Sequence, residues 1–275
     1  MSEAVIKLDN IVKSYGKHDV LKGVTMQVNK GDIYGLVGKN GAGKTTIFKM
    51  ILGLSEYTSG NVSIIGSTNK RELFANRRKV GFFVGSNFYG YLSARDNLQY
   101  YARAKGIPHG KIKDEITRVL DIVGLEDSKK QYKGFSLGMK QRLGIGNAIL
   151  GNPDILILDE PTNGLDPQGI ADVRHMVRRL RDEYNMTVIV SSHILGELEH
   201  TADRFGIVHN GIVAKEITQD DLKSKKPEVN IALSVNDIDR AQKVLADNGI
   251  NILHEVEDRM TLEDYYFDLI GGAAD

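Results

Sequence analysis

The sequence contains no cysteine, which excludes a disulfide framework, a thiolate metal site and a cysteine nucleophile. It also has no excess of either charge, because thirty-six Lys and Arg residues balance thirty-six Asp and Glu residues. A chain without net charge has no bulk attraction to a polyanion such as duplex DNA, so we expect no nucleic-acid partner. Any phosphate chemistry must therefore depend on local groups.

Long apolar runs are also missing. The longest wholly apolar stretches span only a few residues, as at 155–158, whereas a helix needs roughly 20 residues to cross a bilayer. The N-terminal residues include the acidic Glu3 and lack the apolar segment of a secretory signal. We therefore expect a cytoplasmic protein that cannot form a membrane path on its own.

The periodicity of the apolar residues predicts an α/β domain, and 275 residues are enough for this domain and a small appendage. Strands are predicted at 5–8, 24–28, 33–37, 80–84, 154–158 and 187–190. Helices are predicted at 45–52, within 94–127 with a break at 106–108, at 136–150 and at 168–183. Because helices alternate with apolar strands, the core sheet should be largely parallel, after a β-rich layer at the start of the chain.

The C-terminal part has a different pattern. Asn210-Gly211 lies between two short apolar runs and predicts a β-hairpin, and the lysine-rich stretch 223–227 resembles a linker. The rest predicts strand, helix, strand and helix at 229–235, 237–248, 250–256 and 262–270. We therefore expect a main domain at 1–222 and a small α+β appendage at 223–275.

One motif between a predicted strand and a predicted helix fits the phosphate-loop pattern, Gly38-Lys39-Asn40-Gly41-Ala42-Gly43-Lys44-Thr45-Thr46. Its glycines let several backbone N–H groups turn inward, and the N-terminus of the helix adds positive potential. Lys44 would pair with nucleotide phosphates, and the Thr45 hydroxyl would bind Mg²⁺. A purely structural glycine-rich turn is the alternative, and the agreement of strand, spacing and Lys-Thr pair argues against it.

Candidate catalytic residues follow two other predicted strands. Asp159 and Glu160 come directly after the apolar stretch 155–158. An acidic pair at a strand end is more often only solvated, but ligands of parallel sheets bind at these ends and a phosphate loop lies about 115 residues upstream. Asp159 would hold the metal through water, and Glu160 would polarise the attacking water. His193, after the strand at 187–190, is a candidate contact for the γ-phosphate.

A further motif gives the chain a family resemblance: Phe135-Ser136-Leu137-Gly138-Met139-Lys140-Gln141-Arg142. It is similar to the signature motif of the ATP-binding-cassette (ABC) family, although the family usually has glycine at Leu137 and glutamine at Met139. Ser136 can cap the following helix and leave its N-terminal amides free to face an anion. The resemblance covers about residues 4–215. It implies the P-loop NTPase fold of these ATPases, with a mainly parallel core sheet, an antiparallel β layer and a helical insertion at about 88–150.

The resemblance also implies a head-to-tail dimer that encloses two ATP molecules. Each ATP would contact Lys44 of one subunit and Ser136 and Gly138 of the other. Asp166 belongs to a stretch that matches the dimer-contact loop of the family, and Tyr15 matches the aromatic residue that stacks on adenine, although packing alone would also explain Tyr15. The glutamine or glutamate that the family has after the strand at 80–84 is missing from residues 84–87.

The form of the signature and the segment 260–267 resemble ATP-binding subunits of bacterial bacitracin and lantibiotic self-protection exporters. The resemblance implies an ATPase that uses ATP and Mg²⁺ to drive a separate transmembrane permease, and that lies on the inner face of the cell membrane through this permease. The exported compound would be a peptide antibiotic or another amphipathic molecule.

A soluble cassette ATPase that acts on ribosomes or DNA is the alternative. Ribosome-acting members usually carry two cassettes, and DNA-repair relatives have long insertions between phosphate loop and signature. This chain has one cassette and about 92 residues in that interval. A phosphate-loop kinase would leave the signature and the dimer-contact motif unexplained.

Overall fold

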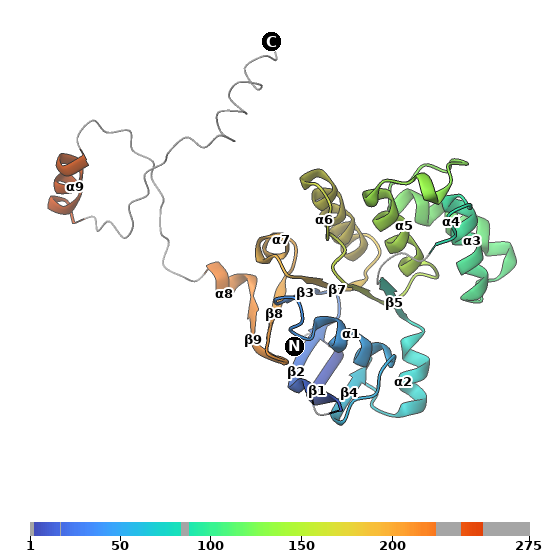
Figure 1. The fold of residues 1–275 in the computed structure, drawn as a ribbon, viewed down its shortest axis with the longest axis horizontal. Helices are drawn as coiled ribbons and strands as arrows, with labels where there is room; N and C mark the ends of the chain where they lie inside the picture. The colour runs from blue at the N-terminus through green and yellow to red at the C-terminus, as the bar shows by residue number, and fades with distance from the viewer. Residues whose placement is uncertain (1–2, 17, 84–87, 224–237, 250–275) are drawn as a thin grey trace, which may run out of the picture. The chain divides into compact units, whose positions relative to one another are not determined.

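The computed structural model describes residues 3–16, 18–83, 88–223 and 238–249, coloured by residue number in Figure 1. The chain divides into two compact units, Met1–Lys226 and Pro227–Asp275. In the second unit, α9 (Ile238–Asp247) lies within the predicted helix at 237–248. The other predicted elements of the appendage, at 229–235, 250–256 and 262–270, lie outside the described residues, as do residues 84–87.

The core of the first unit is a six-stranded sheet in the order β5-β6-β7-β3-β8-β9. All neighbouring pairs are parallel except β8 and β9. This confirms the prediction of a mainly parallel sheet. The strands are β3 (Ile33–Val37), β5 (Val80–Phe83), β6 (Ile155–Leu158), β7 (Thr187–Ser192), β8 (Arg204–His209) and β9 (Ile212–Thr218).

A second sheet of three antiparallel strands has the order β2-β1-β4, from β1 (Ala4–Tyr15), β2 (His18–Asn29) and β4 (Ser59–Ile64). It confirms the expected antiparallel layer, but its first two strands are 12 residues each, much longer than predicted. The predicted elements did not include β4 or α2 (Lys70–Arg77). Helix α2 buries only Leu73, and β4 has only two apolar residues, Val62 and Ile64, so neither has a periodic pattern long enough to be predicted.

Helix α1 (Lys44–Leu52) lies between the two sheets (Figure 1). Its Ile47, Phe48 and Ile51 pack in one apolar cluster with residues of β1, β2 and one face of the core sheet. The opposite face of that sheet, which includes Leu156 and Val188, packs in a second cluster with apolar residues of the helices within 94–149, 167–182 and 195–199. Strands that are covered on both faces are mostly apolar, which is why β6 and residues 188–190 of β7 are continuous apolar runs.

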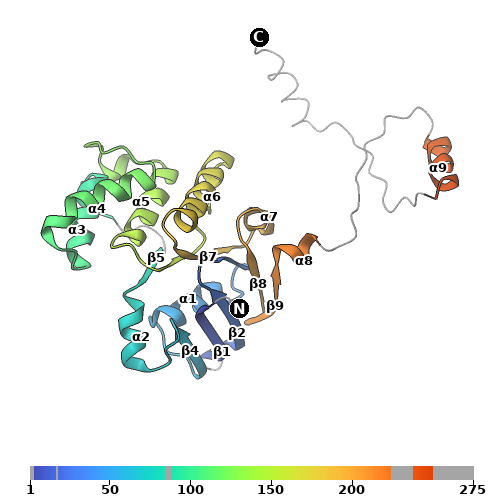
Figure 2. The same ribbon diagram turned by 180° about the vertical axis from the view of Figure 1, so that it is seen from behind.

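The helical insertion consists of α3 (Ala94–Ala104), α4 (His109–Ile122) and α5 (Leu137–Ile149), which lie together beside β5 in both views (Figure 1, Figure 2). The break between α3 and α4 confirms the one predicted at 106–108. Of the described residues, no helix is both long and apolar enough to span a membrane. The remaining described helices of this unit are η1 (Tyr132–Gly134), α6 (Pro167–Asp182), α7 (Leu195–Glu199) and α8 (Gln219–Lys223).

The turn between β8 and β9 is the predicted hairpin. Asn210 and Gly211 have φ angles of 48° and 82°. A two-residue turn of this kind needs positive φ at both central positions, and Asn-Gly adopts it more readily than other pairs. This hairpin contacts the phosphate loop, because Gly211 donates its backbone N–H to the Ala42 carbonyl at 3.2 Å.

Helix α5 and β5 lie so close together that neither Gly144 of α5 nor Gly81 of β5 could carry a side chain without a clash. A Cβ on Gly144 would lie 2.2 Å from Cε2 of Phe83, and a Cβ on Gly81 would lie 2.3 Å from the Ala148 carbonyl oxygen. Phe83 is buried and has little room to move. These contacts fix the helix that carries the signature motif directly against the edge of the core sheet.

We expect Gly144→Ala to destabilise the protein by about 1–3 kcal/mol, because overpacking against Phe83 outweighs the better helix propensity of alanine. Gly110→Ala is the matched control, since it lies in helix α4 with no other atom within 4 Å of a new Cβ. It should be neutral or stabilising by up to about 1 kcal/mol. Chemical denaturation of both variants measures the difference, and equal stabilities would contradict the close packing.

Candidate functional site

The phosphate loop connects the end of β3 to the start of α1, as the sequence predicts. Gly41 and Gly43 have φ angles of 80° and 114°, which residues with a Cβ rarely adopt. Gly43 is also the N-cap of α1, and a Cβ there would lie 2.8 Å from Cδ2 of Leu21. The glycines therefore allow a tight backbone curve at the N-terminus of a helix, where an anion is stabilised.

A pocket of about 530 Å³ opens over this loop. Its lining brings together most of the predicted phosphate-loop residues and the two predicted carboxylates. Val20, on β2, is a wall residue that the sequence did not reveal, because an apolar strand residue carries no signal of its own. The lining residues are Val20, Asn40, Gly41, Gly43, Lys44, Thr45, Thr46, Asp159 and Glu160.

Two of the predicted catalytic side chains, Lys44 and His193, converge on the carboxylate of the third, Glu160. Lys44 Nζ lies 3.2 Å from Oε1 of Glu160, and Nδ1 of His193 lies 3.2 Å from Oε2. The buried Lys44 ammonium also donates to the Gly38 carbonyl at 2.5 Å and to the Lys39 carbonyl at 3.3 Å. Residues from the ends of β3, β6 and β7 therefore meet at one edge of the sheet.

The second carboxylate, Asp159, faces the hydroxyl of Thr45. Thr45 Oγ1 donates to Oδ2 of Asp159 at 2.7 Å. Hydroxyl and carboxylate oxygens are hard donors of the kind that Mg²⁺ prefers, and Mg²⁺ is commonly held by one or two protein groups together with phosphates and water. The donor set therefore fits the expected metal.

Several further polar residues of the site gave no signal in the sequence. Ser191 donates to the other oxygen of Asp159, Oδ1, at 2.7 Å. Glu197 accepts hydrogen bonds from Thr162 at 2.7 Å and from Ser192 at 2.9 Å. The Glu197 carboxylate therefore joins the loop after Glu160 to the strand end before His193. These hydrogen bonds depend on which strands are neighbours in the sheet. The order of the strands cannot be derived from a single sequence.

Seven predicted site residues lie outside the lining of this pocket: Tyr15, Gly38, Ala42, Ser136, Gly138, Asp166 and His193. Ser136 is the N-cap of α5 and accepts from the Met139 N–H at 3.2 Å, as predicted. Asp166 is the N-cap of α6 and accepts from the Gly169 N–H at 3.0 Å. Tyr15 ends β1 with 51% of its surface exposed and has the Lys13 ammonium 4.7 Å from its ring centre.

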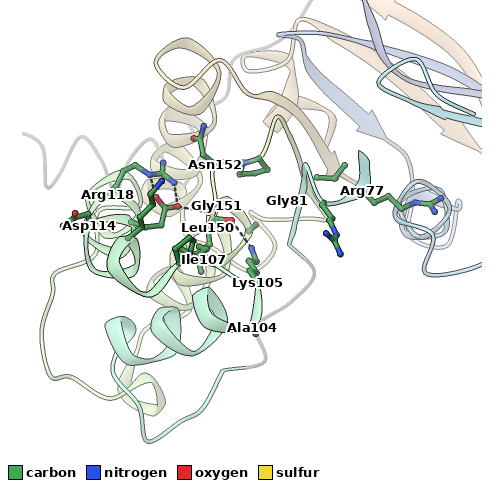
Figure 3. Close-up of a pocket in the computed structure, with 18 residues that line it drawn as sticks. Arg77, Gly81, Ala104, Lys105, Ile107, Asp114, Arg118, Leu150, Gly151 and Asn152 are labelled. Carbon is green, nitrogen blue, oxygen red and sulfur yellow. Dashed lines mark hydrogen bonds and ion pairs between the residues drawn. The ribbon is translucent and has the colours of Figure 1, made fainter. Parts of the chain in front are cut away.

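A larger pocket of about 1340 Å³ lies at the opposite ends of β5 and β6, away from the phosphate loop (Figure 3). Its walls come from the start of β5, the α3–α4 turn, α4 and the end of α5. Lys105 donates to the Asn147 carbonyl at 2.5 Å, and Arg118 donates to the Ile149 carbonyl at 3.1 Å. Both cations therefore bind the C-terminal carbonyls of α5, where positive charge is favourable.

Glu115 of α4 also binds at the C-terminal end of α5. Its carboxylate accepts from Arg118 at 2.7 and 2.9 Å and from the Gly151 N–H at 2.7 Å. Burial opposes its ionisation, but the hydrogen bonds from Arg118 and Gly151 and the nearby positive charges outweigh burial and lower the pKa of Glu115. The ionised carboxylate thus connects α4 to the end of the helix that carries the signature motif.

The fold and the geometry of the pocket define a P-loop nucleotide-binding protein of the α/β class. The sequence profile described as ABC transporter matches residues 21–163. The chain is 39% identical to the bacitracin transport ATP-binding protein BcrA of Bacillus licheniformis, over 98% of both chains. The chain therefore belongs to the ABC transporter family, as an ATP-binding subunit.

Two further comparisons agree with this assignment. The lantibiotic transport ATP-binding protein SrtF of Streptococcus pyogenes is 42% identical over 77% of this chain and 90% of its own. A dimeric structure of MJ0796, a bacterial ABC transporter cassette, superposes with a TM-score of 0.69 at 27% identity, over 78% of this chain and 98% of that chain. The expected fold class is thereby confirmed.

We expect Glu115→Gln to lower the free energy of unfolding at pH 7 by about 1–2 kcal/mol, because a charged hydrogen-bond acceptor is replaced by a neutral one. Because the pKa of Glu115 is lower in the folded state than its ordinary value of 4.5, the ionised carboxylate stabilises the folded protein at pH values above 4.5. This stabilisation is lost as the pH falls through the pKa of the folded state. The difference between wild type and variant should therefore shrink below about pH 4. Urea denaturation at pH 7 and at acidic pH tests this, and a constant difference would argue against the ionised contact.

Proposed function

We propose that the chain hydrolyses ATP and that this hydrolysis drives a separate membrane permease. The observation that carries the proposal is the convergence of Lys44 and His193 on the two carboxylate oxygens of Glu160, at 3.2 Å each. An acid held between a cation and an imidazole, beside a phosphate loop, is suited to orient a water molecule for phosphoryl transfer. Phosphate oxygens of ATP would compete with Glu160 for the Lys44 ammonium and free the acid for this task.

Each predicted residue of the site has a proposed role. The backbone of Gly38, Asn40, Gly41, Ala42 and Gly43, with Thr46, would surround the phosphates, and Tyr15 would stack on the adenine. Thr45 and Asp159 would hold Mg²⁺, which when bound would neutralise charge on the β- and γ-phosphates. His193 would contact the γ-phosphate and keep Glu160 oriented.

Hydrolysis is proposed to need two copies of the ATP-binding subunit. Ser136 and Gly138 open a capped helix, but they lie outside the pocket of their own chain. A second copy could present this helix end to the γ-phosphate, with Asp166 in the contact between the copies. The dimeric state of the related MJ0796 cassette supports this arrangement.

The transported compound is proposed to be a peptide antibiotic or another amphipathic molecule, moved outward. The names of the bacitracin and lantibiotic transport relatives support this class. The permease would hold the chain at the inner face of the cell membrane, and residues 1–222 would form the ATPase with 223–275 as an appendage. A soluble ATPase acting on ribosomes or DNA is not favoured, because these relatives are transport subunits.

Glu160→Gln should bind ATP, accumulate as a dimer and hydrolyse ATP roughly a hundredfold more slowly or worse, because an amide cannot act as a base. The change preserves the size of the side chain, so the ATP pocket remains. Light scattering of the purified full chain with MgATP measures the dimer, and release of phosphate measures turnover.

Lys44→Ala is the control for this experiment, since it removes the cation that pairs with the phosphates. It should neither turn over ATP nor form the ATP-dependent dimer. A Glu160→Gln variant that stays monomeric and hydrolyses ATP at the wild-type rate would refute the proposed site.

Reconstitution of the chain with its permease in vesicles tests coupling to transport. A peptide antibiotic added to these vesicles should raise the ATPase rate severalfold, because substrate binding to the permease favours closure of the ATP-binding subunits. Vesicles with the Lys44→Ala chain should show no ATPase at any peptide concentration. Hydrolysis that is indifferent to every amphipathic peptide tried would contradict the export assignment while leaving the ATPase intact.

A further inference from the structure

Ser191 occupies a central place at the edge of the sheet where the site is formed. It is the next-to-last residue of β7 and is fully buried. It pairs with Leu36 of β3, and the preceding residue Val190 pairs with Leu158 of β6. The side chain therefore lies between the strand that leads into the phosphate loop and the strand that ends in the two carboxylates.

The hydroxyl of Ser191 contacts both acidic residues at once. It donates to Oδ1 of Asp159 at 2.7 Å and accepts the backbone N–H of Glu160 at 2.9 Å. Thr45 donates to the other oxygen of Asp159, Oδ2, at 2.7 Å. The plane of the Asp159 carboxylate is therefore fixed from two sides, and Oδ2 is the oxygen directed at the expected metal ligand Thr45.

Glu160 has a backbone conformation that needs support. Its φ angle is 48°, in the left-handed region where a residue with a Cβ is strained. Such strain persists only where the surroundings hold the residue in place. The hydrogen bond from the Glu160 N–H to Ser191 holds the backbone in this conformation. It thereby orients the Glu160 side chain toward Lys44 and His193.

We propose that Ser191 is a positioning residue for hydrolysis, which orients the metal-binding carboxylate and the catalytic carboxylate through one hydroxyl. This inference rests on the proposed function, because it gives Asp159 and Glu160 the roles assigned above. A serine that merely satisfied buried polar atoms would stabilise the fold without affecting metal dependence or the Glu160 backbone.

Thr187 is the matched comparison on the same strand. It is as deeply buried as Ser191, and its hydroxyl accepts the Gly31 N–H at 2.9 Å. It lies at the start of β7, away from the acidic pair. Thr187→Val therefore removes one buried hydroxyl from β7 without touching the site.

The first experiment measures ATPase activity of the full chain for wild type, Ser191→Ala and Thr187→Val. We expect Ser191→Ala to lower kcat roughly tenfold, the rate equivalent of one hydrogen bond to a charged group, with KM for ATP within about twofold of wild type. The Mg²⁺ concentration for half-maximal rate should rise, because the Asp159 carboxylate is less well oriented. Thr187→Val should keep wild-type kcat and Mg²⁺ dependence.

The second experiment needs neither ATP nor metal. Hydrogen exchange of the Glu160 backbone amide, followed by mass spectrometry or NMR, should be faster in Ser191→Ala and unchanged in Thr187→Val. Exchange in β6 and β7 should remain slow in both variants, which verifies that the sheet is folded.

Wild-type kcat and unchanged exchange in Ser191→Ala would overturn the inference, as would a lower kcat without faster exchange at Glu160. A wild-type chain that does not hydrolyse ATP would defeat the proposed function instead. The exchange measurement would still decide whether Ser191 holds the Glu160 backbone.

Discussion

One carboxylate, that of Asp159, joins three segments that are far apart in the sequence. It follows β6, accepts from Thr45 at the start of α1 and accepts from Ser191 near the end of β7, at 2.7 Å in each case. These contacts exist only because β6, β7 and β3 are neighbours in a parallel sheet, so that their carboxyl ends lie at one edge. The order of the strands is therefore the constraint on which the pocket depends.

The packing around the sheet keeps that edge rigid. Helix α1 is held between two sheets by buried side chains, and the opposite face of the core sheet is covered by helices of the insertion and by α6. Buried apolar side chains in close contact leave little freedom for the strands to shift. A strained residue such as Glu160, with φ of 48°, can be maintained on this support.

Much of the site could be predicted from residue types beside apolar strands. The phosphate loop, Asp159, Glu160 and His193 each follow a strand that is largely apolar, and this signal depends only on local sequence. Ser191 and Glu197 could not be found in this way, because serine and glutamate acquire their roles from the partner strand and loop opposite them. The elements β4 and α2 were missed for a related reason, since α2 buries only Leu73 and β4 only Val62 and Ile64, which is too few apolar residues for a periodic pattern.

The signature motif lies apart from the phosphate pocket of its own chain. Ser136 uses its hydroxyl to cap α5, and Gly138 lies beside the loop that ends in Asp166, where a Cβ would be 3.9 Å from Cδ2 of Leu165. The close packing of Gly144 against Phe83 holds this helix on β5, and neither Ser136 nor Gly138 lines the pocket of its own chain. A rigid helix N-terminus favours an anion wherever it points. The phosphate pocket and the capped N-terminus of α5 are separate on one chain, which is the reason for proposing that a head-to-tail pair completes the site.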